Sequence, residues 1–224
     1  MKYLKFPVLA ILVFLIVGCG TKDPIGPGTQ NNLPPTSIMP LKIGNVWLYD
    51  FEWYTGPSSP PDVVYDYSIT VMDTVRINGE KWYQAAHAVT SVGWTQTVYY
   101  TNRNGGLYFR FSTADGATEY LRFKYPASIG DTYNSTQMFL FTEFGFTGSY
   151  PSEMMGTSVS VTVPHGTHNC YYQYADYDPG TPNPVSLKDY FKPNLGMVKS
   201  DFQVYDGSVY FTYFVWKLKQ VQLQ

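Results

Sequence analysis

The 224-residue chain has little charge: only 14% of its residues are Asp, Glu, Lys or Arg, and its formal net charge is −2. A charge this small and this evenly balanced gives no broad electrostatic basis for binding nucleic acid. Hydrophobic residues still make up 44% of the chain and aromatic residues 18%, a composition that excludes a disordered polymer. We therefore expect a folded protein with no nucleic-acid partner.

Sequence motifs for catalysis are also missing. The chain has no Gly-x-Ser-x-Gly, no His-Glu-x-x-His, no phosphate-binding glycine loop and no Cys-x-x-Cys pair, which are the local signatures of common enzyme classes. These absences predict a protein that is not an enzyme, has no catalytic residues and uses no cofactor. The remaining catalytic hypothesis is a hydrolase whose site is assembled from His87, Asp66 and Glu119.

Metal-ligating residues are few. His165 and His168 lie close to Cys170, but no further ligands are nearby in the sequence, so we favour a turn histidine and a strand histidine over a metal site. Asp176 and Asp178 could provide oxygen ligands for calcium, but one such pair is short of a complete site. We expect a solvated loop there and predict no metal.

Cysteine occurs only at positions 19 and 170. Cys170 lies in a strand-like run in which a small apolar thiol packs well, so we expect it to be buried; a reactive thiol is the alternative.

Only one long hydrophobic run is present, and it is at the N-terminus. Lys2 and Lys5 precede an apolar stretch from about residue 6 to residue 17, which is too short to span a bilayer as a mature helix. This pattern predicts a signal peptide over residues 1–18.

The end of this segment resembles the lipobox of bacterial lipoprotein precursors, because Ile16, Gly18 and Cys19 occupy its aliphatic, small and cysteine positions. The resemblance implies cleavage before Cys19, lipid attachment to its thiol and membrane anchoring through the attached chains. Gly20 follows the cysteine, where aspartate would retain many lipoproteins on the inner membrane, so the expected location is the outer membrane of the bacterial cell envelope. The alternative is an ordinary secretory peptide with an incidental cysteine.

Residues 19–38 are rich in Gly, Pro, Thr and Asn and lack apolar periodicity. This composition predicts a disordered, flexible tether between the anchor and a single folded domain over residues 39–224.

The rest of the chain alternates apolar and polar residues with a period of two. In residues 46–53 the aromatic residues fall on one face and the acidic residues on the other, and the same alternation recurs at 65–71, 107–111, 121–125, 158–163 and 209–218. Residues that accept positive φ separate these runs at 78–79, 104–106, 115–116 and 206–207. We predict an all-β fold of about ten to twelve strands, with at most one or two short helical turns. Its strands form one large antiparallel curved sheet, an open half-barrel or barrel-like.

A short sequence motif, which we call the echoed phrase, occurs twice in this domain. Residues 40–47 and 126–133 both read Pro, two variable residues, Ile, Gly, Asn or Asp, one variable residue and an aromatic residue. One interpretation is two similar halves, 40–125 and 126–224; the other, which we favour, is a common turn that leads into an aromatic strand. Either interpretation expects positive φ at Gly44 and Gly130.

Two phrases in the second half resemble those of uncharacterised bacterial cell-envelope lipoproteins. They are Val-Pro-x-Gly-Thr-x-x-Cys at residues 163–170 and Tyr-x-x-Pro-x-Leu-Gly-x-Val-Lys at residues 190–199. With the Gly-Asn-x-Trp phrase at residues 44–47, the resemblance covers most of residues 40–200. It implies a strongly curved all-β sheet, similar to the open half-barrels of lipoprotein carriers, and implies no activity or catalytic residues.

The aromatic residues carry the remaining functional information, because aromatic rings can line apolar cavities, stack on sugars or fill a β core. We predict a non-enzymatic, lipid-anchored envelope protein that binds an apolar ligand or lipid on its curved sheet. The candidate ligand-lining residues are Trp47, Tyr49, Phe51 and Trp53. The alternatives are a structural or assembly component that contacts other envelope proteins in a surface complex, and a glycan-binding module, which would carry aromatic rings on an exposed face.

Overall fold

The computed structural model describes residues 37–57, 60–103, 105–138, 147–177 and 184–224. These residues form twelve β-strands and a single 3-10 turn, Thr90–Val92, which confirms the all-β prediction. The strands are β1 (Val46–Trp53), β2 (Val63–Ile77), β3 (Glu80–Val89), β4 (Trp94–Arg103), β5 (Gly105–Arg110), β6 (Tyr120–Tyr125), β7 (Thr132–Met138), β8 (Thr147–Val163), β9 (Gly166–Tyr177), β10 (Val185–Lys192), β11 (Gly196–Tyr205) and β12 (Tyr210–Gln222). The predicted signal peptide, Cys19 and nearly all of the predicted tether lie outside the described residues.

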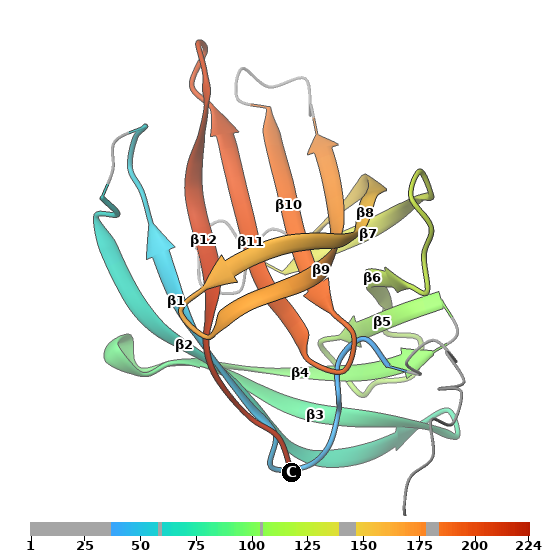
Figure 1. Ribbon diagram of the computed structural model, residues 1–224. Helices are drawn as coiled ribbons and strands as arrows, with labels where there is room; N and C mark the ends of the chain where they lie inside the picture. The colour runs from blue at the N-terminus through green and yellow to red at the C-terminus, as the bar shows by residue number, and fades with distance from the viewer. Residues whose placement is uncertain (1–36, 58–59, 104, 139–146, 178–183) are drawn as a thin grey trace, which may run out of the picture. The chain divides into compact units, whose positions relative to one another are not determined.

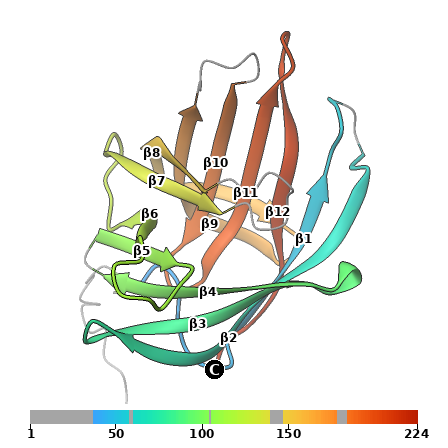
Figure 2. The ribbon, with the colours of Figure 1, turned by 180° about the vertical axis from the view of Figure 1, so that it is seen from behind.

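All twelve strands belong to one antiparallel sheet, in the order β6-β5-β4-β3-β2-β1-β12-β11-β10-β9-β8-β7 (Figures 1 and 2). The order consists of two meanders of six strands, β1–β6 and β7–β12. They join in the middle of the sheet, where β1 pairs with β12 and Phe51 lies opposite Trp216. The echoed phrase suggested two halves with a boundary between residues 125 and 126, and this boundary falls between the two meanders.

The sheet curves strongly, as predicted. Strand β6 is at one edge, yet its side chains contact strands near the other edge: the rings of Phe123 and Phe191 on β10 lie 4.3 Å apart, and those of Tyr125 and Tyr171 on β9 lie 5.3 Å apart. One face of the curved sheet therefore encloses the core, and the other faces outward.

Strand β1 shows how the alternating pattern produces this core. Trp47, Tyr49 and Phe51 are each 0% exposed, whereas Asp50 and Glu52 between them stay partly exposed and pair with lysines of β12. Because successive side chains of a strand point to opposite faces, one run of residues supplies both the core and the ionic outer face.

Strand β6 departs from the predicted alternation. Leu121 pairs with Tyr108 and Phe123 pairs with Leu107, so Arg122 is an extra residue with no register partner on β5. Such a bulge reverses the faces on its two sides. The expectation that Leu121 and Phe123 share one face is therefore wrong, and Arg122 is buried instead of projecting into solvent.

The first described residues pack into the core ahead of β1. Ile38 and Met39 are almost completely buried, and the carbonyl of Met39 accepts a hydrogen bond from the side chain of Asn102 on β4. The carbonyl of Ser37 accepts another from the backbone amide of Asn194. Ile38, at the end of the predicted tether, is thus part of the packed domain.

The first copy of the echoed phrase forms a turn that is hydrogen-bonded to the backbone of β2. The amide of Gly44 donates to the carbonyl of Val71 at 2.9 Å, and the amide of Val71 donates to the carbonyl of Asn45 at 3.0 Å. Gly44 has φ +89°, as predicted.

The second copy makes the same contacts in the second meander. The amide of Gly130 donates to the carbonyl of Met154 at 2.8 Å, and the amide of Met154 donates to the carbonyl of Asp131 at 2.9 Å. Gly130 has φ +86°, again as predicted. The two phrases therefore perform the same structural role at the start of each meander.

Replacing Gly130 by Ala should lower the free energy of unfolding by about 1–2 kcal/mol, because a side chain disfavours the left-handed region. An added Cβ would meet no atom within 4 Å, so the loss would be conformational. Chemical denaturation measures it. Gly56→Ala is the control, since Gly56 has open space and no positive φ, and an equal loss in both variants would contradict the explanation.

Candidate functional site

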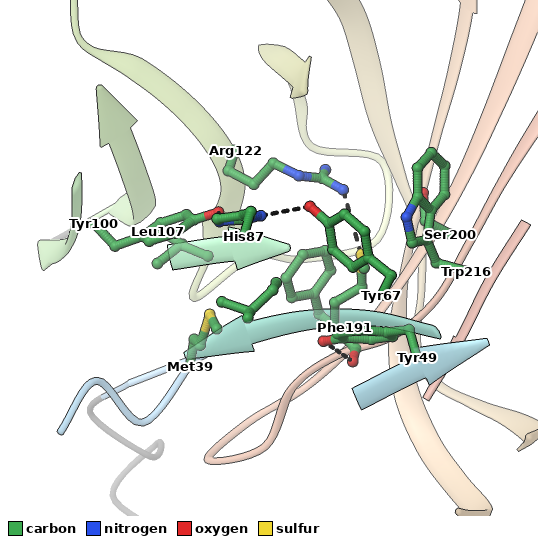
Figure 3. A pocket seen from close by; sticks show the side chains of 12 residues that line it. Met39, Tyr49, Tyr67, His87, Tyr100, Leu107, Arg122, Phe191, Ser200 and Trp216 are labelled. Carbon is green, nitrogen blue, oxygen red and sulfur yellow. Dashed lines mark hydrogen bonds between the residues drawn. The ribbon is translucent and has the colours of Figure 1, made fainter. Parts of the chain in front are cut away.

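A cavity of about 50 Å³ lies on the inner face of the sheet (Figure 3). Strands of both meanders contribute to it, as does the segment that precedes β1. Its lining residues are Met39, Tyr49, Tyr67, Ile69, His87, Tyr100, Leu107, Arg122, Phe191, Met197, Ser200 and Trp216. Most of these side chains are apolar or aromatic, but a histidine, three tyrosines and an arginine are present as well.

His87 forms the centre of a hydrogen-bonded group in this wall. Its Nδ1 lies 2.5 Å from the hydroxyl of Tyr67, and its Nε2 lies 2.9 Å from the hydroxyl of Tyr100. The three residues come from the adjacent strands β2, β3 and β4, whose curvature turns the three rings toward one another (Figure 3). Both ring nitrogens therefore have a partner.

Burial keeps this group uncharged. It lowers the pKa of His87 to about 3 and raises the pKa of Tyr67 and Tyr100 well above the usual value for tyrosine. A neutral imidazole has one N–H donor and one acceptor nitrogen, so it can accept a proton from one tyrosine and donate to the other. The group supplies polarity to the cavity without a net charge.

Arg122 supplies the one positive charge in the wall, and it is paired. Its guanidinium donates to both carboxylate oxygens of Asp189 on β10, at 2.8 and 3.2 Å. Burial alone would lower the pKa of Arg122, but the charge and hydrogen bonds of Asp189 outweigh burial and raise it. The pair is almost entirely removed from solvent, with side-chain exposures of 7% and 1%.

Further polar side chains donate hydrogen bonds to the carboxylate of Asp189. The hydroxyl of Ser200 donates to it at 2.6 Å and the amide of Gln173 at 3.4 Å. Gln173 also donates to the hydroxyl of Ser135 and accepts from that of Tyr133. A buried ion pair is stable only when its remaining lone pairs are satisfied in this way, so the network explains how a charge pair can lie inside the core.

The size of the cavity limits what it can hold. Pockets that enclose a drug-sized ligand measure about 300–1,000 Å³, whereas this one has room for only a few non-hydrogen atoms. The cavity is partly open, so a ligand could insert a small apolar group and leave the rest of its structure outside. Arg122, Tyr67 and His87 would then lie beside that group.

Three of the four predicted ligand-lining residues are completely buried and the fourth, Trp53, is half-buried; of the four, only Tyr49 lines the cavity. Trp47 packs in the core and donates from Nε1 to the carbonyl of Leu195 at 2.6 Å. Phe51 contacts Phe214 and Trp216, and Trp53 is half-buried against Phe214. Cys19 lies outside the described residues.

The three residues of the hydrolase hypothesis have separate partners. His87 bonds to the two tyrosines, Asp66 pairs with Lys219, and Glu119 pairs with Arg103. None of these contacts joins one of the three residues to another, so they provide no support for a shared catalytic site.

The histidines near Cys170 lie close together. Nδ1 of His165 is 3.1 Å from Nε2 of His168, and the side chain of Lys192 is 3.4 Å from the other nitrogen of His168. Within the described residues, no group of three or more His, Cys, Asp or Glu side chains could hold a metal ion. Asp178 lies outside them.

Cys170 is buried, as expected, and burial raises its pKa to about 11.

Sequence reasoning missed Arg122, Asp189 and Ser200. An arginine in an alternating strand ordinarily faces solvent, and no local signal marks the bulge that turns Arg122 inward. Asp189 is 67 residues away in the chain, so only the fold brings the pair together. The sequence did contain a signal that His87 faces inward, because His87 lies at alternate positions with the apolar Ala85 and Val89.

The inner cavity and the twelve-stranded sheet define an all-β protein of a fold already seen in bacteria. A candidate exported protein with a YmcC-like fold from Bacteroides fragilis NCTC 9343 is similar, with a TM-score of 0.52 and 13% identity over 83% of this chain and 98% of that chain. A candidate lipoprotein from Parabacteroides distasonis ATCC 8503 has a TM-score of 0.49 and 13% identity over 84% and 99% of the two chains.

No protein-family model and no curated protein matches the chain. At 13% identity, the likeness to the Bacteroides fragilis protein establishes the fold alone. In the part of the chain that the structure describes, no helix is long and apolar enough to cross a membrane.

The protonation of His87 should make stability depend on pH. The unfolded chain binds a proton at the ordinary pKa of 6.5, whereas the folded chain binds it only near pH 3. The unfolded state therefore holds more protons between these values, and the free energy of unfolding should fall as the pH drops from about 6.5 toward 3. Denaturation of the protein and of His87→Gln at several pH values tests this. An equal pH dependence in both would contradict it.

Proposed function

We propose that this chain is a non-enzymatic, lipid-anchored protein of the bacterial cell envelope that binds the small apolar end of a ligand in its inner cavity. The anchor is Cys19, and the outer membrane is the proposed location because Gly20 follows it. The lipobox-like residues, the Gly- and Pro-rich segment after them and the likeness in fold to a candidate exported protein all support an envelope location.

The observation that carries the binding proposal is the wall of the cavity. Apolar side chains such as Ile69, Leu107 and Trp216 form most of it, and Arg122 and His87 add polar groups that are held by hydrogen bonds. Ligand sites in proteins commonly combine a mostly apolar wall with a few oriented polar groups. Apolar contact would provide affinity, and the polar groups would orient the ligand.

The chemistry of the wall also limits the ligand. The pairing of Arg122 with Asp189 neutralises the charge, and the tyrosine–histidine group is neutral. A fully ionised ligand group would lose its hydration here without meeting a free opposite charge, which is costly. An uncharged methyl, short alkyl or aromatic group fits these limits, whereas a complete acyl chain needs more space than about 50 Å³.

Native mass spectrometry of residues 20–224, produced without the anchor in a bacterial periplasm, tests the proposal. The native mass is compared with the mass of the denatured protein. We expect a reproducible additional mass that can be identified as a lipid or another apolar molecule. A clean protein mass would instead favour the structural or assembly role, and crosslinking to envelope partners would then be the informative experiment.

A cavity-filling variant tests whether such a ligand binds in the cavity. In Ile69→Phe the larger ring should occupy the free space and lower ligand occupancy by about tenfold, equivalent to about 1.4 kcal/mol of binding free energy. Val64→Phe is the matched control, because it adds the same ring at a side chain that is 53% exposed. Equal occupancy in Ile69→Phe and the control would rule out the cavity as the binding site.

A further inference from the structure

A second concave site lies on the outward face of β7, β8 and β9, apart from the inner cavity. It is a groove of about 510 Å³, a volume within the range of ligand-binding pockets. The residues that line it are Thr132, Tyr133, Asn134, Pro151, Ser152, Glu153, Tyr174 and Asp176.

Burial along the strands establishes which side chains face outward. On β9, Gln173 and Ala175 are each 1% exposed and point to the core, so Tyr174 between them points outward. On β8, Ser152 is buried in the same way, and Glu153 beside it is exposed. The groove therefore presents a tyrosine ring and a carboxylate on the same face.

The register brings these groups together across three strands. Thr132 pairs with Glu153, and Glu153 pairs with Tyr174, so the three side chains form one row. Asn134 pairs with Pro151 two residues along the same strands. Directly opposed side chains in a sheet lie about 4.5–5.5 Å apart at Cβ, which is close enough for one small ligand to contact several of them.

Neither carboxylate of the groove has a cationic partner in the part of the chain that the structure describes. Among the described residues, no salt bridge or hydrogen bond involves the side chain of Glu153 or Asp176. Asp176 is two residues from Tyr174 on β9 and therefore lies on the same face. Burial and this carboxylate raise the pKa of the Tyr174 hydroxyl, although a hydrogen bond with Ser186 acts in the opposite direction. Lys188 on β10 lies directly opposite Tyr174 on the same outward face, on the flank of Tyr174 away from Glu153, and is not one of the residues that line the groove.

We propose that this groove binds a saccharide that carries a free amino group. The apolar face of a sugar ring would lie on Tyr174, which lies on the same outward face of the sheet as both acids. The protonated amine would form charge-assisted hydrogen bonds with Glu153 and Asp176, and it would be attracted to the tyrosine face as well. The Asn134 amide and the Thr132 hydroxyl supply hydrogen bonds for sugar hydroxyls.

The same groups disfavour other ligands. A uronic acid or a phosphorylated sugar would place its negative charge next to two carboxylates, which is unfavourable. An acyl chain would cover polar side chains without replacing the hydrogen bonds that they make to water. This site and the inner cavity lie on opposite faces of the sheet, so one can bind its ligand whether or not the other does.

Calorimetric titration of the full lipidated chain, held in a detergent without sugar groups, tests the proposal at mildly acidic pH. The probes are the linear trimer of glucosamine, its N-acetylated form and a uronic acid trimer. We expect the glucosamine trimer to bind, the N-acetylated trimer to bind about tenfold more weakly and the uronic acid trimer not to bind. Added salt should weaken binding of the glucosamine trimer.

Variants at exposed positions separate stacking from charge. Tyr174→Ala should weaken binding of the glucosamine trimer by about tenfold or more, and Tyr174→Phe should retain most of the affinity, since it keeps the ring. The double variant Glu153→Gln, Asp176→Asn should lose the preference for the amine over its N-acetylated form. Asp73→Asn, an exposed carboxylate on β2, is the matched control and should bind as the unaltered chain does.

Three results would overturn the proposal: no binding of the glucosamine trimer, equal affinity for the amine and N-acetylated trimers, or unchanged affinity in Tyr174→Ala. The thermal unfolding midpoint of each variant verifies folding. The carboxylate variants keep the test decisive if Tyr174→Ala loses stability, because they alter only exposed groups. If no ligand is found in the inner cavity but the glucosamine trimer still binds to this groove, the result contradicts the proposed function of the inner cavity and leaves this proposal standing.

Discussion

The buried ion pair between Arg122 and Asp189 is the interaction on which the rest of the structure depends. Arg122 is the bulge residue of the edge strand β6, and Asp189 belongs to β10 in the other meander. Removing both charges from water is costly, and the cost is offset only because the carboxylate also receives hydrogen bonds from Ser200 and Gln173. The pair thereby fixes the edge of the first meander against the second and shapes one wall of the inner cavity.

The curvature that this contact maintains gives the two faces of the sheet different chemistry. On the inner face, large rings fill most of the space, and the cavity that remains is lined by neutral or neutralised polar groups. On the outer face, side chains such as Tyr174 and Glu153 stay accessible and form an open, acidic groove. This difference underlies the two sites that we propose, one for a small apolar group on the inner face and one for a positively charged polar ligand on the outer face. One domain can provide both sites because alternate residues of the same strands face opposite sides.

Much of the fold could be predicted because its determinants are local. The alternation in β1 and the positive φ of Gly44 and Gly130 each follow from a few neighbouring residues, and the structure has them as expected. The site could not be predicted to the same extent. Arg122 faces inward because of a bulge, and its partner is 67 residues away, so neither periodicity nor composition could identify the pair. Of the aromatic residues on β1, only Tyr49 reaches the cavity, because the position of a ring along the curved strand, and not its face alone, decides what it contacts.

A double-mutant cycle on this ion pair tests the central claim most directly. Arg122→Met and Asp189→Leu should each lower the free energy of unfolding by about 3–5 kcal/mol, because each leaves an unpaired charge in the core. The double variant should recover most of the loss, since no charge is then left buried without a partner. Losses that simply add in the double variant would mean that the two side chains act independently, and they would contradict the account in which this contact joins the two meanders.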